Sequence, residues 1–426
     1  MKQKLTAELW DKMHYLFRSY NDRMVHVELD YDCEFDIKAF KTVVICFLEK
    51  IPVLHSSFVD NKVRPYWQVE KYKIEDIVSV HYLDGEELEK AKNEFLTQCL
   101  PPDGKVQMRI ALFIHDGKTD LCIIENHMCM DGGDFKYFLK SLCSNYNNYV
   151  KNSVIPLDIK EGSRSYKDVY KSLSEEEQEI AKNLYRNIAE KDKHGFPFAE
   201  PQKTDYSFIY KHKVGSDKLE QTKLKGKVHD ATVNDMLVAA YFYSIYELAE
   251  FPESDSVSIS CAIDLRRHIE NAEETGLTNH TAWMQCFVPE RGRDIFETLR
   301  YVVQSSNQFK QDDFIGLYGL PLLSTAFKIV PNAVSEELIK IGYANPLLAM
   351  SNIGILEADK LALDGHEPMD GFMSGAVKYK PFALLSATTL NKEITLSMCV
   401  RGNDEDKKIL KKFFELMDKN IDTLIS

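Results

Sequence analysis

The stretch LCIIENHMCMDGGDFKYFLKSLCSNY, residues 121–146, decides the fold because it joins two kinds of periodicity at one turn. It opens with an apolar run, and apolar residues then recur at helical spacing from Phe135 onward. This pattern predicts a buried strand, a turn at Gly132-Gly133 and an amphipathic helix that starts near Asp134. His127 lies between the strand and the turn, which is where α/β folds place reacting groups.

His127 is therefore a candidate general base. The partial positive charge at the N-terminus of the following helix disfavours a protonated imidazole. A neutral imidazole is the form that accepts a proton near pH 7. Asp131 lies four residues later across a turn, where it is poorly placed to pair with the ring but could pair with an arginine from elsewhere and lock the loop. Gly132 and Gly133 permit either a positive φ or a close backbone approach.

Two other interpretations fit the same residues. A histidine next to an apolar strand is more often a packed core residue than a catalytic one. His127 and Asp131 could also be two ligands of a metal ion, but no His-x-x-x-His or Cys/His cluster supplies a third. We therefore expect no metal.

The rest of the chain alternates strand-like and helix-like segments in two similar parts. In the first part, two apolar runs are joined by Asp116-Gly117, a strong hairpin signal. The last segment, 404–424, is helix-like. We predict an α/β protein with an N-terminal unit over residues 1–155, a charged helical linker over 156–205 and a C-terminal unit over 206–426.

Composition narrows the possible partners. The 426 residues carry 53 Lys and Arg against 66 Asp and Glu, a formal charge of −13, and a net negative field repels nucleic acids. Nine cysteines without a Cys-x-x-Cys pair indicate reduced thiols and a cytoplasmic protein. Pro321, Lys328 and Pro331 interrupt the most apolar stretch, 314–334, so we predict a buried or lid-like helical pair there and no membrane span.

Five segments in order resemble one family. Asn126-His127 to Asp131-Gly132 resembles the His-His-x-x-x-Asp-Gly motif of the condensation-domain, alcohol acetyltransferase and wax-ester synthase group, which belongs to the chloramphenicol acetyltransferase-like acyltransferase superfamily. The resemblance covers about residues 10–420. The other four segments are Arg109 in VQMRIALF, residues 232–240 (TVNDMLVAA), residues 264–267 (DLRR) and residues 351–354 (SNIG).

The resemblance implies two chloramphenicol acetyltransferase-like α/β sandwich subdomains with a tunnel between them. It implies that His127, midway along the tunnel, takes a proton from a small alcohol or amine acceptor, which then attacks the thioester of acyl-CoA or of a phosphopantetheine-linked acyl carrier protein. No permanently bound cofactor is implied. Asp131 and Gly132 would be structural, and Arg266 is the expected partner of Asp131, with Arg267 as the fallback.

Further residues are weaker candidates. Ser351 and Asn352 would contact the oxyanion or the thiol arm of the donor, or else only cap the end of a strand. Residues 211–227 hold six lysines and a local charge of +4. We list Lys211, Lys213 and Lys223 as contacts for donor phosphates, although a solvated helix face explains them as well. His280 is expected beside the tunnel, and the apolar residues 314–343 would line it or form a core helix.

Two departures from the family pattern bear on function. Asn126 stands where the motif has its first histidine, and residues 370–375 match poorly the Asp-Phe-Gly-Trp-Gly motif of the plant-type relatives. Our first hypothesis is an acyltransferase. The alternative is a non-catalytic condensation-like module that binds a carrier protein or a partner enzyme.

Overall fold

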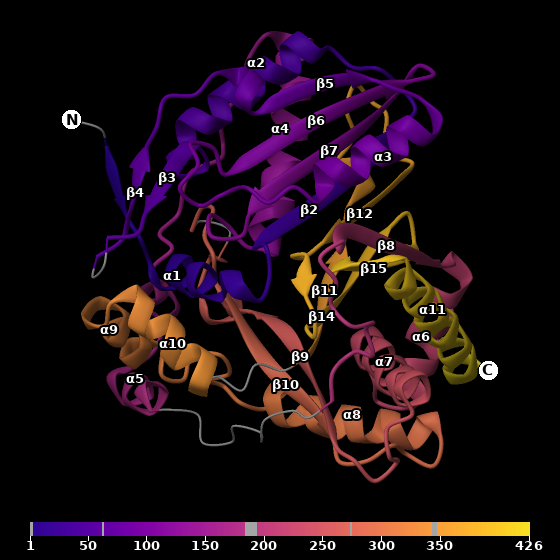
Figure 1. Ribbon diagram of the computed structural model, residues 1–426. Coiled ribbons are helices and arrows are strands. Elements are labelled where there is room, and N and C mark those ends of the chain that lie inside the picture. The colour runs from indigo at the N-terminus through magenta and orange to yellow at the C-terminus, as the bar shows by residue number, and fades with distance from the viewer. Residues whose placement is uncertain (1–2, 62–63, 184–193, 273–274, 343–346) are drawn as a thin grey trace.

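A computed structural model describes residues 3–61, 64–183, 194–272, 275–342 and 347–426 (Figure 1). Two α/β units, each built around its own sheet, lie one above the other in this view. The predicted fold class is therefore confirmed. No helix among these residues is long and apolar enough to cross a membrane.

The first sheet is made mostly by the N-terminal unit. Its strand order is β12-β2-β7-β6-β5. Alternate residues of β7 point to opposite faces, so Leu121 and Ile123 join the core under α2 and α4, whereas Cys122 and Ile124 pack with α3. The elements are β2 (Met24–Tyr31), α2 (Ile37–Lys50), β5 (Val78–Tyr82), α3 (Gly85–Leu96), β6 (Met108–His115), β7 (Lys118–Asn126) and α4 (Gly132–Asn152).

The second sheet follows the order β10-β9-β11-β14-β15-β13, and β8 pairs with β15 as well. Its core is formed with α7, α8 and α11, whose buried side chains belong to the same cluster as those of the strands. The elements are β8 (Tyr206–Val214), α6 (Ser216–Val228), α7 (Val233–Ala249), β9 (Val257–Asp264), β10 (Thr281–Val288), α8 (Ile295–Lys310), β11 (Leu348–Ile355), β13 (Lys378–Tyr379), β14 (Ala383–Leu390), β15 (Glu393–Gly402) and α11 (Asp404–Ile425).

One strand crosses between the units. β12 (Asp370–Ser374) comes from the C-terminal part of the chain but pairs antiparallel with β2, with Phe372 opposite Glu28. Figure 1 shows it at the edge of the first sheet, beside β2. Residues 370–390 form three separate strands, β12, β13 and β14, of which only β12 joins the first sheet.

A third cluster of apolar side chains joins segments that are distant in the sequence. α1 (Leu9–Leu16) packs there with the described part of the predicted linker, which includes α5 (Glu175–Lys182), and with α9 (Leu320–Ile329) and α10 (Asn332–Gly342). Residues 184–193 of that linker lie outside the described part of the chain. The three-stranded sheet of β1 (Lys4–Thr6), β4 (Tyr66–Val69) and β3 (Ser56–Val59) lies beside the first sheet.

Candidate active site

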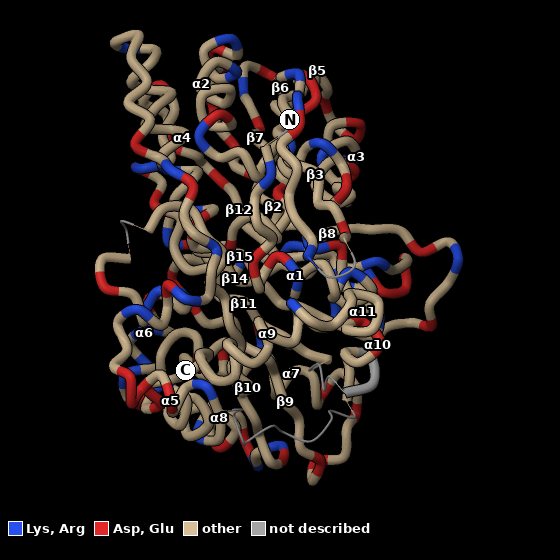
Figure 2. Tube along the Cα trace, turned by 90° about the vertical axis from the view of Figure 1, so that its left-hand side faces the viewer, with Lys and Arg blue, Asp and Glu red and all other residues tan. Residues whose placement is uncertain are grey.

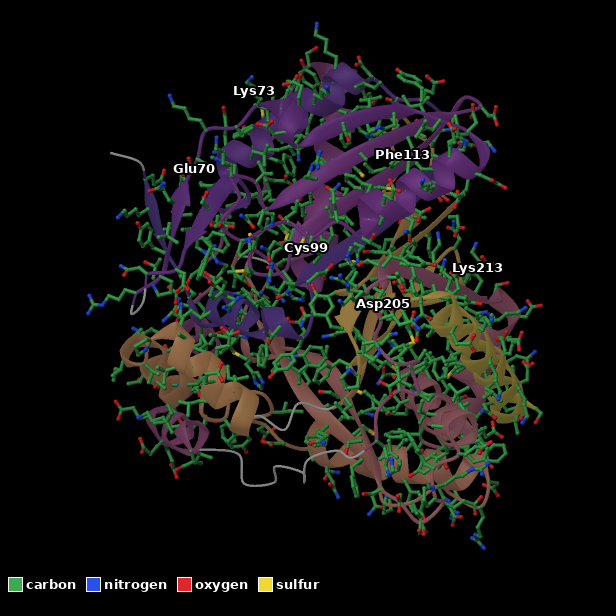
Figure 3. The ribbon with its side chains drawn as sticks, viewed as in Figure 1. Glu70, Lys73, Cys99, Phe113, Asp205 and Lys213 are labelled. Atoms are coloured by element: carbon green, nitrogen blue, oxygen red, sulfur yellow. The ribbon has the colours of Figure 1, made fainter. Side chains whose placement is uncertain are left out.

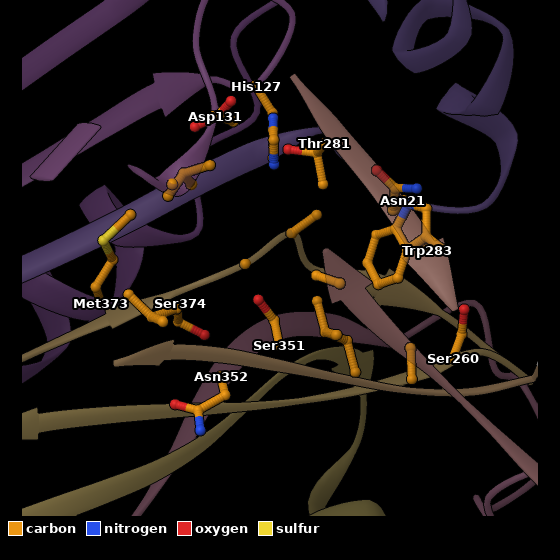
Figure 4. A pocket seen from close by; sticks show the side chains of 18 of the residues that line it. Asn21, His127, Asp131, Ser260, Thr281, Trp283, Ser351, Asn352, Met373 and Ser374 are labelled. Atoms are coloured by element: carbon orange, nitrogen blue, oxygen red, sulfur yellow. The ribbon is translucent and has the colours of Figure 1, made fainter. Parts of the chain in front are cut away.

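A pocket of about 320 Å³ lies between the two units and has His127 in its wall (Figure 4). Its lining comes from both units, as expected for a site between subdomains. The α1–β2 segment, the start of α4, strands β9, β10 and β11, and the segment from β12 to β14 all contribute. The lining residues used below are His14, Asn21, Arg23, His127, Asp131, Lys136, Asp264, Arg266, Trp283, Ser351, Asn352, Met373, Lys378 and Phe382.

Main-chain hydrogen bonds hold the loop that carries His127 at the end of β7. The His127 N–H donates to the Arg23 carbonyl oxygen at 2.8 Å, and the side-chain amide of Asn279 donates to the His127 carbonyl oxygen. Asn126 is buried just before it, where its Nδ2 donates to Gln107 Oε1 at 2.8 Å and its Oδ1 accepts from the Met128 N–H. The ring therefore projects from a fixed backbone into the pocket (Figure 4).

The environment of His127 favours the neutral ring. Burial lowers the pKa of His127 below its usual value; Asp131 opposes this shift, and Lys378 adds to it. The Nδ1 atom is buried and has no hydrogen-bond partner among the described residues. Since the ring lines the pocket, Nε2 is the nitrogen left to meet a substrate. A neutral ring is what general-base chemistry requires at pH 7.

A second histidine stacks on the first. The rings of His14 and His127 lie with their centroids 4.4 Å apart and their planes 25° apart. Burial lowers the pKa of His14 well below its usual value, and His127 lowers it further. His14 belongs to α1, so the third apolar cluster, which anchors this helix, also fixes the position of the stacked pair. Nothing in the spacing of the sequence indicated this contact.

Asp131 caps α4 and pairs with Arg266. Its Oδ1 accepts from the N–H groups of Gly133 and Asp134, at 2.9 and 3.1 Å. Its Oδ2 accepts from Arg266 Nη2 at 2.8 Å and from the His280 N–H at 2.7 Å. The expected contact between Asp131 and Arg266 thus forms, and His280 joins it through its backbone. No hydrogen bond links Asp131 to the ring of His127 among the described residues.

Arg266 forms ion pairs with three carboxylates. Besides Asp131, it donates to Asp134 at 2.6 Å and to Asp264 at 2.9 Å. Burial would raise the pKa of Asp131, but Arg266 and the N–H donors hold it below its usual value. Burial and the charge of Asp131 raise the pKa of Asp134 to about 7. Arg266 therefore favours the ionised form of Asp131, whereas burial and the charge of Asp131 disfavour the ionised form of Asp134.

At this turn, the absence of a side chain on the glycines matters more than their φ angles. Neither Gly132 nor Gly133 has a positive φ, so the first of the two expected alternatives does not occur at this turn. A Cβ on Gly133 would lie 3.2 Å from Asp131 Oδ1 and 3.4 Å from Arg266 Nη1. Close approach to the ion pair is thus the feature that favours glycine at position 133.

Ser351 and Asn352 lie on β11 and line the pocket below His127 in Figure 4. Asn352 Oδ1 accepts from the Gly354 N–H at 3.1 Å, so part of this side chain caps the strand end. No hydrogen bond to the Ser351 hydroxyl is made by another described residue, which leaves this group able to turn toward a ligand.

The three lysine candidates lie away from this pocket, and each is already paired. Lys211 on β8 binds Glu28 at 3.0 Å, and Lys213, seen at β8 in Figure 3, binds Asp370 at 2.7 Å. Lys223 binds Glu220 at 2.8 Å. Figure 2 shows acidic and basic residues interleaved along both units. The basic segment is therefore mostly neutralised by neighbours and does not form a separate cationic face.

The described side chains of helices α9 and α10, within the apolar stretch 314–343, do not line the pocket around His127. No described residue between 314 and 339 lines this pocket, so of the two expected alternatives the structure favours packing into a core. Leu320 and Phe327 pack into the third cluster instead, while Leu322 and Leu338 are more than half exposed. The period of the apolar residues was that of a helix, but it did not identify the surface on which the helix packs.

Metal-binding potential lies elsewhere in the described part of the chain. Two groups of side chains bring three potential ligand atoms together, and neither contains His127 or Asp131. They are Asp32 with Cys33 and His366, and Asp84 with His115 and Asp116. The pocket itself therefore offers histidine and hydroxyl chemistry without a cluster of metal ligands among the described residues.

A sequence model of the condensation domain matches residues 12–277, which is more than half of the chain. The chain belongs to the condensation-domain family. Condensation domains carry out acyl or peptidyl transfer on substrates held by carrier proteins. No curated protein matches the sequence.

Solved structures of condensation domains and their relatives share this fold. The first condensation domain of the calcium-dependent antibiotic synthetase aligns with a TM-score of 0.70 at 12% identity, over 100% of this chain and 98% of that one. Polyketide synthase associated protein 5 from Mycobacterium tuberculosis gives 0.68 at 14% identity, over 99% and 100%. Trichothecene 15-O-acetyltransferase from Fusarium sporotrichioides gives 0.67 at 12% identity, over 98% and 95%. At such low identities these matches establish the fold alone.

Proposed function

We propose that this condensation-family protein transfers an acyl group from a thioester to a hydroxyl or amine acceptor, with His127 as the general base. The observation that carries the proposal is the imidazole of His127, held by its backbone and stacked on His14 in the wall of a pocket between the two units, where burial lowers its pKa. A base positioned in this way typically contributes about 10²–10⁴-fold in rate.

In the proposed reaction, the His127 ring carries one proton from the acceptor to the leaving thiolate. His127 Nε2 takes the proton of the acceptor as its oxygen or nitrogen attacks the thioester carbonyl carbon. The carbonyl oxygen becomes an oxyanion, and the Ser351 hydroxyl is the group on β11 that could donate to it. Collapse of the tetrahedral intermediate breaks the C–S bond, and the imidazolium returns the proton to the leaving thiolate.

Asp131, Gly132 and Arg266 hold the site without touching the reacting atoms. Asp131 fixes the first turn of α4 and binds Arg266, which comes from the segment after β9. This pair ties the His127 loop to the second unit. The thiol arm of the donor is that of CoA or of a carrier protein, and Asn352 lines the pocket where it could contact that arm.

Substitution of His127 tests the proposal. The protein is incubated with radiolabelled acyl-CoA, and separately with acylated carrier protein, together with mixed alcohols and amines, and thiol release and labelled product are measured. We expect His127→Ala to remove turnover by about 10²-fold or more. His229→Ala, a change at an exposed histidine, is the matched control and should leave turnover unchanged.

One outcome would reject the assigned base, and another would reject the acyltransferase. Turnover that persists in folded His127→Ala would reject His127 as the base. Binding of acylated carrier protein by the wild type without thiol release, for every acceptor, would instead support a non-catalytic module that recruits a carrier protein.

A further inference from the structure

Two cations line the pocket on the side of His127 that α1 and β13 form. Lys378 is on β13 and forms an isolated β-bridge with Asn21. Arg23 lies just after Asn21 in the chain and has a φ of 64°. Both side chains line the pocket with His14 and His127. We call Arg23 and Lys378 the basic lobe. Figure 4 shows Asn21, the bridge partner of Lys378, on one side of His127 and Met373 on the other.

The charge of the basic lobe is not balanced by the protein. The pocket lining holds four cations and two carboxylates, and both carboxylates, Asp131 and Asp264, bind Arg266. Lys136 donates to the Ile353 carbonyl oxygen at 2.6 Å. The ammonium of Lys378 forms no hydrogen bond or ion pair within the described residues.

Arg23 is only weakly bound. Its Nη2 lies 3.5 Å from the Leu100 carbonyl oxygen and 3.8 Å from Cys99 Sγ, and its Nε is buried without a partner among the described residues. A buried guanidinium normally satisfies its donors in a fixed fork of hydrogen bonds. The unused donor is therefore a second, independent sign that a ligand belongs here.

The charge of Asp22 acts on both Arg23 and Lys378, but Asp22 forms no ion pair with either of them among the described residues. Asp22 Oδ1 accepts from the N–H groups of Met24 and Val377 at 3.0 Å, and its Oδ2 is buried without a partner. Burial raises the pKa of Asp22 to about 7, although its N–H donors and the charges of Arg23 and Lys378 oppose this shift. Burial also lowers the pKa of Lys378 to about 8, and the charge of Asp22 opposes this shift.

From these contacts we infer that the basic lobe binds a carboxylate of the acceptor, so that the acceptor is a hydroxy acid or an amino acid. The description of the ligand as the acceptor rests on the proposed function, whereas the binding of a carboxylate at the basic lobe does not depend on it. A carboxylate would supply the missing counter-charge and would accept from both Lys378 and Arg23. The phosphates of a donor fit less well, because the length of a pantetheine arm separates them from the thioester, which must lie at His127.

The aromatic lining suggests suitable probes. Phe17 and Phe382 line the pocket from the segments that carry Asn21 and Lys378, and Phe382 packs edge-on against Tyr20. An acid with a phenyl side chain fits such a lining. Two matched pairs isolate the negative charge: 3-phenyllactate with 3-phenyllactamide, and phenylalanine with phenylalaninamide.

The test measures binding of each pair to the full chain by isothermal titration calorimetry. In the wild type we expect each acid to bind at least about tenfold more tightly than its amide, the range of one charge-assisted hydrogen bond. Lys378→Met should remove this preference, and Lys378→Arg should keep most of it. Lys136→Met, a lysine of the same pocket outside the lobe, is the control and should keep the preference.

Several results would overturn the inference. The inference fails if, in both pairs, the wild-type protein binds the acid no more tightly than its amide. The inference also fails if a folded Lys378→Met variant keeps the wild-type preference for the acids over their amides. A loss of kcat in Lys378→Met that is equal for acid and amide acceptors would assign Lys378 to the oxyanion instead. Acid preference without thiol release would reject only the acyltransferase, whereas thiol release without acid preference would reject only the anion site.

Discussion

At the scale of single residues, Asn126 shows how a departure from the family motif is absorbed. It occupies the position of the first motif histidine, yet it is buried and binds Gln107 and the Met128 N–H. Its own N–H donates to the Gln107 carbonyl oxygen at 2.8 Å. The side chain therefore shapes the loop that presents His127, and such a role does not require an imidazole.

The pH dependence of turnover follows from the environment of His127. Burial lowers its pKa, so the neutral base persists below the usual histidine range. We expect kcat/KM to stay level as the pH falls from 8 to about 6.5 and to decline only in more acidic solution. His14→Phe keeps an aromatic ring against His127 and should preserve this profile. A decline that begins at or above pH 7 would contradict the assigned protonation state.

The three carboxylates around Arg266 should respond differently to neutralisation. Asp131→Asn removes the ionised partner of a buried guanidinium and should cost about 3 kcal/mol of unfolding free energy. Asp134→Asn replaces a group whose pKa is raised to about 7, so at pH 7 it should cost about 1 kcal/mol or less. Urea unfolding of both variants at pH 7 provides the comparison. Equal losses would show that the two carboxylates carry the same charge.

Residues within recognisable motifs could be predicted, and residues brought in by packing alone could not. His127 was identified because it follows a recognisable strand, and Asp131 and Arg266 because the segments that carry them resemble motifs of the family. His14 and Lys378 reach the pocket only through contacts distant in the chain, the stacking of His14 on His127 and the bridge between Lys378 and Asn21. Their functional meaning depends on unpaired polar atoms, which have no sequence signature.

At the scale of elements, β12 is held against β2 by a glycine. A Cβ on Gly371 would lie 2.6 Å from the Glu28 carbonyl oxygen and 2.8 Å from Leu29 Cδ2. Gly371→Ala should therefore push β12 from the first sheet and cost about 1–3 kcal/mol of unfolding free energy in urea denaturation. Gly215→Ala is the control, since its Cβ would meet nothing within 4 Å, and it should change stability by about 0.5 kcal/mol or less.

Elements with local signals were predicted well. Thr232 and Asp235 form a capping box at the start of α7, and Asp36 caps α2, so both helices begin at residues with a strong local preference for that position. β12 was missed because a five-residue strand at a sheet edge depends on its partner and not on its own sequence. The same limit explains why the apolar period of 314–343 predicted helices but not the surface on which they pack.

At the scale of the molecule, charged side chains link the two units outside the pocket. Lys211 on β8 reaches Glu28 on β2, and Lys92 binds Glu28 at 3.0 Å and Asp120 at 2.9 Å. Lys211 also lies over the ring of Phe372 on β12, at 4.7 Å from its centroid. A lysine expected to meet donor phosphates is thus part of the contact between β8 and the first sheet.

The crossing strand and α1 make each unit depend on the other. A fragment of residues 1–155 would lack β12 and expose the edge of β2, and α1 would lose the bond from Trp10 Nε1 to the Thr281 carbonyl oxygen. We expect this fragment to aggregate when expressed alone and to become soluble when co-expressed with residues 156–426, as measured by size-exclusion chromatography and thermal unfolding. A cooperative transition of the isolated fragment would show that the first sheet is stable without β12. The pocket would then join two independent domains, and the position of His127 relative to Lys378 and Ser351 would depend on their docking.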